Sequence, residues 1–147
     1  MEGRPGANPV DEVAQRRDRM QLTIDGLRRA VELADRGDGG WQDAVAQAMN
    51  EAAATWERHV AGTEAPRGIL AEVLEREPRL AHMVDALRAD HVELRAVLGR
   101  AREKVTTQDP AHASEEVQAV AARLSRHHHL GAELIHSAYD VELGGGG

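Results

Sequence analysis

The chain has 147 residues and a formal net charge of −7, and it is 41% hydrophobic but only 2% aromatic. This length suits one domain, the acidic balance argues against a nucleic-acid partner, and the absence of cysteine excludes disulfides, thiolate metal sites and cysteine nucleophiles. No apolar run approaches the roughly 18 residues of a membrane span and the acidic N-terminus does not resemble a signal peptide, so we expect a cytoplasmic protein without a membrane partner.

The first third of the chain predicts a tail and a long helix. A core built mainly from Leu, Val and Ala, with no Phe, favours helices over sheets. Residues 1–10 contain glycine and proline, and we predict a disordered tail there. Apolar residues with helical spacing over residues 11–34 predict a helix, which the glycine-rich segment 36–40 ends.

The middle of the chain contains two further long helical patterns with a short one between them. The second long helix is predicted over residues 41–60, and glycine and proline within 62–66 interrupt it. Pro66 suits the first turn of a short helix that ends before Pro78, where the third long helix begins and continues to about Val105.

The last helix is predicted to follow a polar loop at residues 106–113. Ser114, with two glutamates directly behind it, fits a helix N-cap. Residues 144–147 are four glycines, and we expect a flexible tail there. Four long amphipathic segments with short connections predict an all-α protein, an antiparallel four-helix bundle over residues 11–143 with a short extra helix between the second and third long helices.

One histidine on each of the last three long helices is predicted to face the core. His59, His91 and His127 each fall on the apolar stripe of their helix at about 100° per residue. His91 lies 14 residues before Val105 and His127 lies 13 after Ser114, so an antiparallel pair places them at a similar height. One such histidine alone is more often a core residue bonded to a carbonyl, but three converging neutral imidazoles are what a divalent metal needs.

Two neighbouring positions extend this candidate site. Glu64 follows His59 where the second helix ends, and its carboxylate could supply a fourth metal ligand, although Thr63 is the better-placed residue on an uninterrupted helix. Gly131 lies one turn beyond His127 on the core face, where a glycine costs about 1 kcal/mol relative to alanine. It provides either close packing between helices or space for a small ligand beside the histidine.

A second set of polar residues lies on the opposite face of the last helix. His129, Glu133, His136 and Asp140 are spaced by four, three and four residues. This spacing resembles that of metal ligands, but it is more typical of a solvated helix face. Adventitious zinc or nickel could still bind there.

Several runs of the chain resemble the hemerythrin-like, or HHE cation-binding, family. They are His59-Val-Ala-Gly-Thr-Glu64-Ala-Pro-Arg-Gly-Ile-Leu, Pro78-Arg-Leu-Ala, Leu87-Arg-Ala-Asp-His91-Val-Glu-Leu and Gly131-Ala-Glu-Leu-Ile-His-Ser-Ala-Tyr-Asp-Val-Glu-Leu-Gly-Gly. The match covers most of the chain beyond about residue 20. The resemblance implies an antiparallel four-helix bundle with a non-haem di-iron centre that binds dioxygen or nitric oxide.

The chain departs from the ligand pattern that the resemblance implies. The family's first helix supplies a histidine, whereas residues 11–34 contain none. The second helix should read His-x-x-x-Glu, but Thr63 occupies that place and Glu64 comes one residue later. Arg95 stands where the third helix should repeat its histidine, and a fixed cation there would repel a second metal. We predict that Arg95 points into the bundle centre and pairs with Glu64, because an unpaired buried charge is costly.

The fourth helix keeps part of the family's pattern. His128 with Glu133 matches the expected His-x-x-x-x-Glu, although the helical wheel turns Glu133 outward. A complete di-iron centre is therefore not expected. The remaining residues could hold one metal, hold a small anion or ligand with help from Arg95, or form no site.

Three functional interpretations stay open. The first, which we favour, is a hemerythrin-like protein that binds a metal ion or a small molecule such as dioxygen or nitric oxide, and could sense oxygen, nitric oxide or redox state. Its cofactor would be non-haem iron, mononuclear or dinuclear, or absent. The second is an enzyme that uses the same histidines for acid–base or metal-assisted chemistry. The third is a metal-free interaction scaffold.

Overall fold

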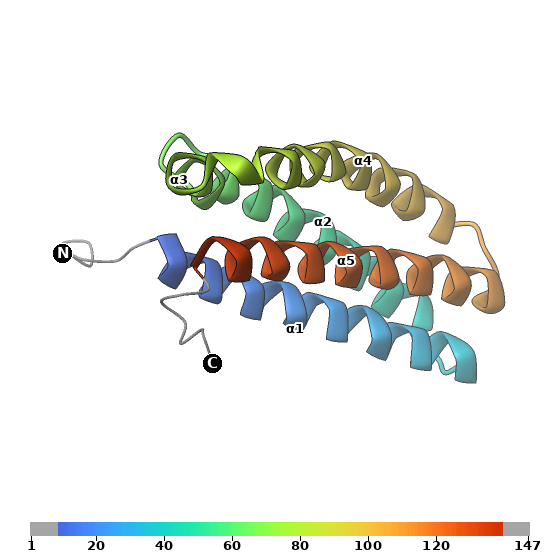
Figure 1. The fold of residues 1–147 in the computed structure, drawn as a ribbon. Helices are drawn as coiled ribbons and strands as arrows, with labels where there is room; N and C mark the ends of the chain where they lie inside the picture. Colours follow the sequence, from blue (N-terminus) through green and yellow to red (C-terminus); the bar gives the residue numbers. More distant parts are fainter. Residues whose placement is uncertain (1–8, 140–147) are drawn as a thin grey trace.

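The computed structural model describes residues 9–139, and these residues are almost entirely helical (Figure 1). They form five α-helices and one short 3₁₀ helix, and no strand occurs within this part of the chain. The all-α prediction is therefore confirmed. The predicted tail at residues 144–147 lies outside the described residues, as do residues 1–8 of the predicted N-terminal tail, whereas residues 9 and 10 already belong to the first helix.

The helices lie close to their predicted positions. They are α1 (Pro9–Arg36), α2 (Trp41–Thr63), α3 (Ile69–Arg76), the 3₁₀ helix η1 (Pro78–Leu80), α4 (Ala81–Val105) and α5 (Pro110–Tyr139). The turn between α1 and α2 depends on Gly37 and Gly40, whose φ angles of 67° and 84° are positive and favour glycine.

The prediction that Ser114 caps the last helix is wrong. α5 begins four residues earlier, at Pro110, because Asp109 provides the cap: its carboxylate accepts a hydrogen bond of 2.9 Å from the backbone N–H of His112. Ser114 is buried, and its hydroxyl instead donates a hydrogen bond of 2.6 Å to Asp35 of α1. The serine therefore links two helices.

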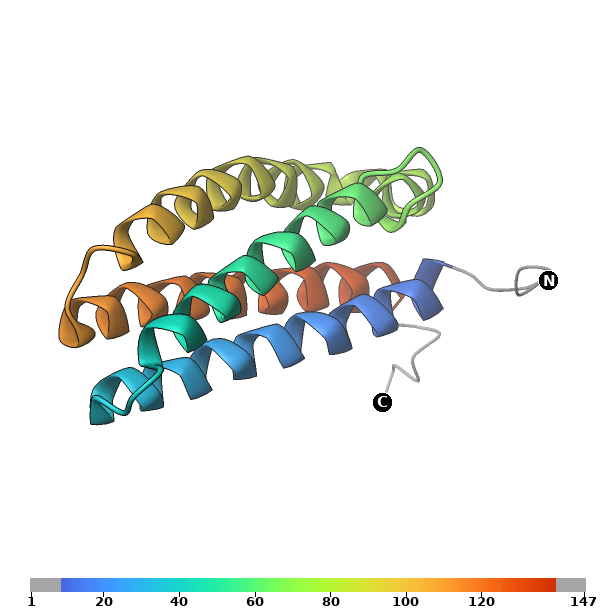
Figure 2. The same ribbon diagram turned by 180° about the vertical axis from the view of Figure 1, so that it is seen from behind.

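The four long helices pack side by side. α1 and α4 each pack against both α2 and α5, while α3 packs against the ends of the long helices. Consecutive long helices run in opposite directions, and α3 lies at the end of the molecule where α1 begins (Figures 1 and 2). None of the described helices combines the length and apolar character that crossing a membrane would require.

The core consists of two apolar clusters. The larger one joins α1, α2, the second half of α4 and the first part of α5, and it includes Leu94 and Leu124. The smaller one joins α3, the first half of α4 and the end of α5, and it includes Leu87 and Leu134. In sequence, His91 lies between Leu87 and Leu94 of α4, and α5 shows the same order around its buried histidine. The imidazole rings of His91 and His127 therefore interrupt the apolar core where the two clusters meet.

Candidate metal centre

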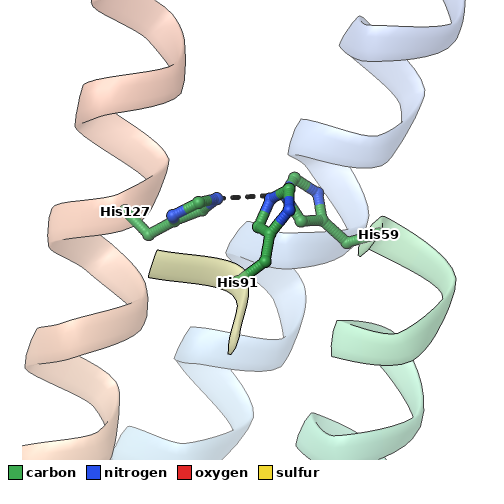
Figure 3. Close-up of side chains that lie close together, drawn as sticks. All are labelled: His59, His91 and His127. Carbon is green, nitrogen blue, oxygen red and sulfur yellow. Dashed lines mark hydrogen bonds between the residues drawn. The ribbon is translucent and has the colours of Figure 1, made fainter. Parts of the chain in front are cut away.

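Three histidines from three helices meet in the core (Figure 3). His59 comes from α2, His91 from α4 and His127 from α5. Each offers one ring nitrogen, and these three nitrogens lie within 4.8 Å of one another. Nε2 of His59 and Nε2 of His127 are 3.1 Å apart. The predicted convergence of the three imidazoles is therefore present.

Trp56 fixes the orientation of all three rings. It lies one turn before His59 on α2, is only 1% exposed, and stacks on the His59 ring at a centroid distance of 5.2 Å. Its edge contacts are with His91 at 5.5 Å and with His127 at 4.8 Å. Its Nε1–H donates to the backbone carbonyl of His91 at 3.2 Å. The indole thus shields one side of the site from water.

Carboxylates hold the second nitrogen of two of the histidines. Oδ2 of Asp90 lies 2.7 Å from Nδ1 of His127, and a carboxylate oxygen of Glu64 contacts Nδ1 of His91. An ionised carboxylate only accepts hydrogen bonds, so each of these imidazoles donates from Nδ1, and in its neutral form it presents a lone pair on Nε2. Arg123 supports this arrangement, since its Nη2 lies 3.3 Å from the other oxygen of Asp90.

His59 differs from the other two histidines. Because His127 accepts at Nε2, His59 must donate across the 3.1 Å contact from its own Nε2. Nδ1 of His59 is buried and has no hydrogen-bond partner among the described residues. An unpartnered buried nitrogen is costly, so the arrangement of these residues leaves the His59 imidazole partly unsatisfied.

The surroundings of His59 and His127 favour their neutral forms. Burial, followed by the neighbouring imidazoles His127 and His91, lowers the pKa of His59 to about 3. Burial also lowers the pKa of His127, although the hydrogen bond to Asp90 opposes the shift. An uncharged imidazole is the form that binds a metal, so His59 and His127 are in their ligating form at neutral pH.

A small cavity adjoins the three histidines. Its volume is about 50 Å³, and apolar side chains of α1, α3, α4 and α5 form most of its wall, together with Arg16, Arg17, His128 and Gly131. A Cβ atom built on Gly131 would meet no atom within 4 Å, so this glycine is not required for close packing between helices. Of the two explanations for Gly131, space beside the histidines is the one that the structure supports.

Arg95 does not occupy the centre, so the prediction of a buried Arg95–Glu64 pair is wrong. Its side chain is 57% exposed, and its guanidinium binds both carboxylate oxygens of Glu57 at 2.7 and 2.6 Å. Arg95 is turned by about 40° from His91 on the helix, and its long side chain reaches the surface, where the charge stays hydrated. Glu64 contacts Nδ1 of His91 and does not join the three converging nitrogens as a fourth ligand.

The last two predicted ligands lie apart from the three nitrogens. His128 is half-buried and lines the cavity, while Glu133 is exposed, as the helical wheel indicated. Within the described residues, His59, His91 and His127 are the one group whose ligand atoms are close enough to share a metal ion.

Sequence reasoning missed Asp90 and Trp56 as parts of the site. The sequence indicated that a buried His127 needs a hydrogen-bond partner. That partner is Asp90, which lies on another helix, directly before His91. Asp90 is off the apolar stripe of α4, and only the packing of α4 against α5 brings its carboxylate to the imidazole. Adjacency to a core histidine is the signal that could have singled it out.

Comparisons with protein-family models, with curated proteins and with solved structures give no match for this chain. Function is therefore inferred from the residues of the site and their surroundings.

Proposed function

We propose that the chain is a hemerythrin-like antiparallel four-helix bundle that binds one divalent metal ion through His59, His91 and His127. The observation that carries this proposal is the convergence of three ring nitrogens within 4.8 Å, with Asp90 and Glu64 bound to the opposite nitrogens of two rings. Such carboxylate–histidine pairs orient metal ligands and make them more basic. Three imidazoles with a fourth position free form the ligand set of many catalytic zinc sites, and imidazole also suits iron.

The separations of the nitrogens are compatible with one ion. Metal–nitrogen distances of 2.0–2.1 Å in a tetrahedral site place ligand nitrogens about 3.3 Å apart. The 3.1 Å between Nε2 of His59 and Nε2 of His127 is close to this value. The remaining separations, up to 4.8 Å, are larger, so the rings would have to move closer together around an ion. Coordination at Nε2 of His59 also removes the proton that this atom now donates.

A second metal does not fit the same residues. Glu64 is engaged by His91, Glu133 is exposed, and Arg95 is paired with Glu57 at the surface. The described part of α1 provides no histidine. We therefore propose a mononuclear site and not the di-iron centre that the resemblance implies.

The cavity supports a role in binding a small ligand. A metal ion held by three imidazoles supplies an open coordination position. The cavity of about 50 Å³ exceeds the roughly 10–15 Å³ that one water requires, so it accommodates a molecule of diatomic size such as dioxygen or nitric oxide. Its mostly apolar wall suits an uncharged diatomic. A sensor or carrier of such a ligand is the function that this site supports best.

The proposal is tested by metal stoichiometry. Metal-free protein is loaded with Fe²⁺ under anaerobic conditions or with Zn²⁺, desalted, and assayed by mass spectrometry for metal per chain. We expect one ion per chain, none in His91→Ala, and one in the control His136→Ala, which alters an exposed histidine of α5. Two ions per chain would overturn the mononuclear site. A wild-type chain that binds no ion would overturn the metal function and support the metal-free scaffold instead.

A further inference from the structure

A second small cleft lies on the α1–α2 side of His59. Arg16 and Arg19 of α1 and Thr55, Arg58 and His59 of α2 line it, and its volume is about 40 Å³. Three arginines on one cleft form a local positive patch in a chain whose net charge is −7. The spacings of three and four residues place these side chains on the facing sides of the two helices.

The position of Arg16 is fixed by the backbone of α2. A Cβ atom on Gly62 would lie 2.3 Å from Nε of Arg16 and 2.5 Å from its Cζ, so the guanidinium lies where a larger residue would have its side chain. The charge of Arg16 is also among the causes that lower the pKa of His59, which shows that the two groups are close. Gly62 therefore allows a cation to lie against α2 beside a core histidine.

Thr55 adds a hydroxyl to the cleft. Its Oγ1 accepts a hydrogen bond of 3.1 Å from Thr23 and one of 3.3 Å from Arg58, which leaves its own proton to donate. Arg19 and Arg58 are exposed, so a ligand can reach the cleft from solvent. Guanidinium groups present paired N–H donors that match two oxygens of an oxoanion.

We propose that this cleft binds a phosphate-type oxoanion, either free phosphate or the phosphate group of a small molecule. Its volume exceeds that of one water severalfold, which suits a group with several oxygens. Three guanidinium groups favour a dianion over a single carboxylate, because each added cation strengthens the attraction.

His59 links this cleft to the metal centre, and the link rests on the proposed metal function. A cation bound at Nε2 of His59 and an anion bound in the cleft attract each other across one imidazole, so each raises the affinity for the other.

The test is a calorimetric titration of the metal-free full chain with inorganic phosphate at low ionic strength. We expect saturable binding, weakened about tenfold or more in Arg58→Gln and in Arg19→Gln. The matched control is Arg100→Gln, an exposed arginine of α4 that does not line the cleft. Absence of saturable binding, or equal loss in the control, overturns the site. Phenyl phosphate in the same titration distinguishes the sources: tighter binding indicates a phosphomonoester, and equal or weaker binding indicates free phosphate.

Gly62→Ala provides a variant that changes no charge. The added methyl displaces the flexible end of Arg16, while alanine favours the helix, so circular dichroism should show intact helices and phosphate affinity should fall. Unchanged affinity would remove Arg16 from the site. Repeating the titration with zinc-loaded protein should give severalfold tighter binding, and equal affinity would overturn the coupling. The titrations of metal-free protein test the cleft even if the metal centre fails.

Discussion

His127 and His129 are two residues apart on α5 but have different surroundings. The first is 3% exposed, donates from Nδ1 to Asp90 and packs against Trp56. The second is exposed, and its ring lies 6.1 Å from that of His128. They are separated by about 200° around the helix. The difference shows that a run of histidines carries no single function, because facing and partners decide what each ring does.

Among the changes that test this difference between His127 and His129, we expect the largest effect at Asp90, the partner of His127. Asp90→Asn keeps an oxygen that can accept from His127 but removes the negative charge, and losing such a partner typically weakens metal binding about 10–100-fold. We expect this loss in a competition titration with a chromophoric chelator. The matched control is Glu93→Gln, since Glu93 contacts the same Arg123 at 3.5 Å but is exposed. Wild-type affinity in Asp90→Asn would mean that the carboxylate does not support the metal ligand.

The metal-free protein should lose stability in acid because of its inner histidines. The pKa of His59 is lowered from 6.5 to about 3 in the folded state and that of His127 is also lowered, so below pH 6.5 the unfolded chain binds protons that the folded chain does not. The free energy of unfolding should therefore fall as the pH decreases from about 6.5 toward 3. Urea titrations at several pH values measure this slope, and His59→Gln should reduce it.

The exposed His112 serves as a control because its pKa is shifted in the opposite direction to those of His59 and His127. Its hydrogen bond to Asp109 raises its pKa above 6.5, so its contribution to stability is present at low pH and is lost as the pH rises through the raised value. His112→Gln should therefore destabilise the protein slightly more below pH 6.5 than above the raised pKa, and it should leave the slope between about pH 6 and 4 unchanged. A reduction of this slope as large as that in His59→Gln would contradict the difference between inner and outer histidines.

The smallest effect is expected at Arg95. Arg95→Gln removes an exposed ion pair with Glu57, and such pairs contribute little because water and salt screen them. We expect unchanged metal content and an almost unchanged melting temperature by differential scanning calorimetry. Loss of metal in this variant would place the guanidinium inside the site, contrary to its observed exposure.

Much of the fold was predictable because helical periodicity is local. The stripes of Leu and Val defined the long helices, and glycine and proline defined their breaks, since both act through backbone geometry within a few residues. The start of α5 was misplaced because Ser114 and Asp109 both satisfy the local rule for an N-cap. In the structure Asp109 binds the N–H of His112, whereas the hydroxyl of Ser114 binds Asp35. The second of these contacts joins residues distant in sequence.

The site was predictable in part for the same reason. Helical facing placed His59, His91 and His127 toward one axis, because a side chain's azimuth follows from its position in the sequence. It could not place Arg95, whose long chain reaches away from its own Cβ. It also could not find Asp90, whose role depends on how α4 packs against α5.

The sequence separation of the three histidines has a consequence for how the molecule is assembled. Each lies on a different long helix, and the contacts between them join residues 32, 36 and 68 positions apart in the chain. Contacts of this range form only after loop closure has brought separate helices together. A nascent chain that ends before α5 lacks both His127 and the helix that carries it. An ion that needs all three histidines, as we propose, would therefore bind only after the helices have come together, and it would not act as an early template for the fold.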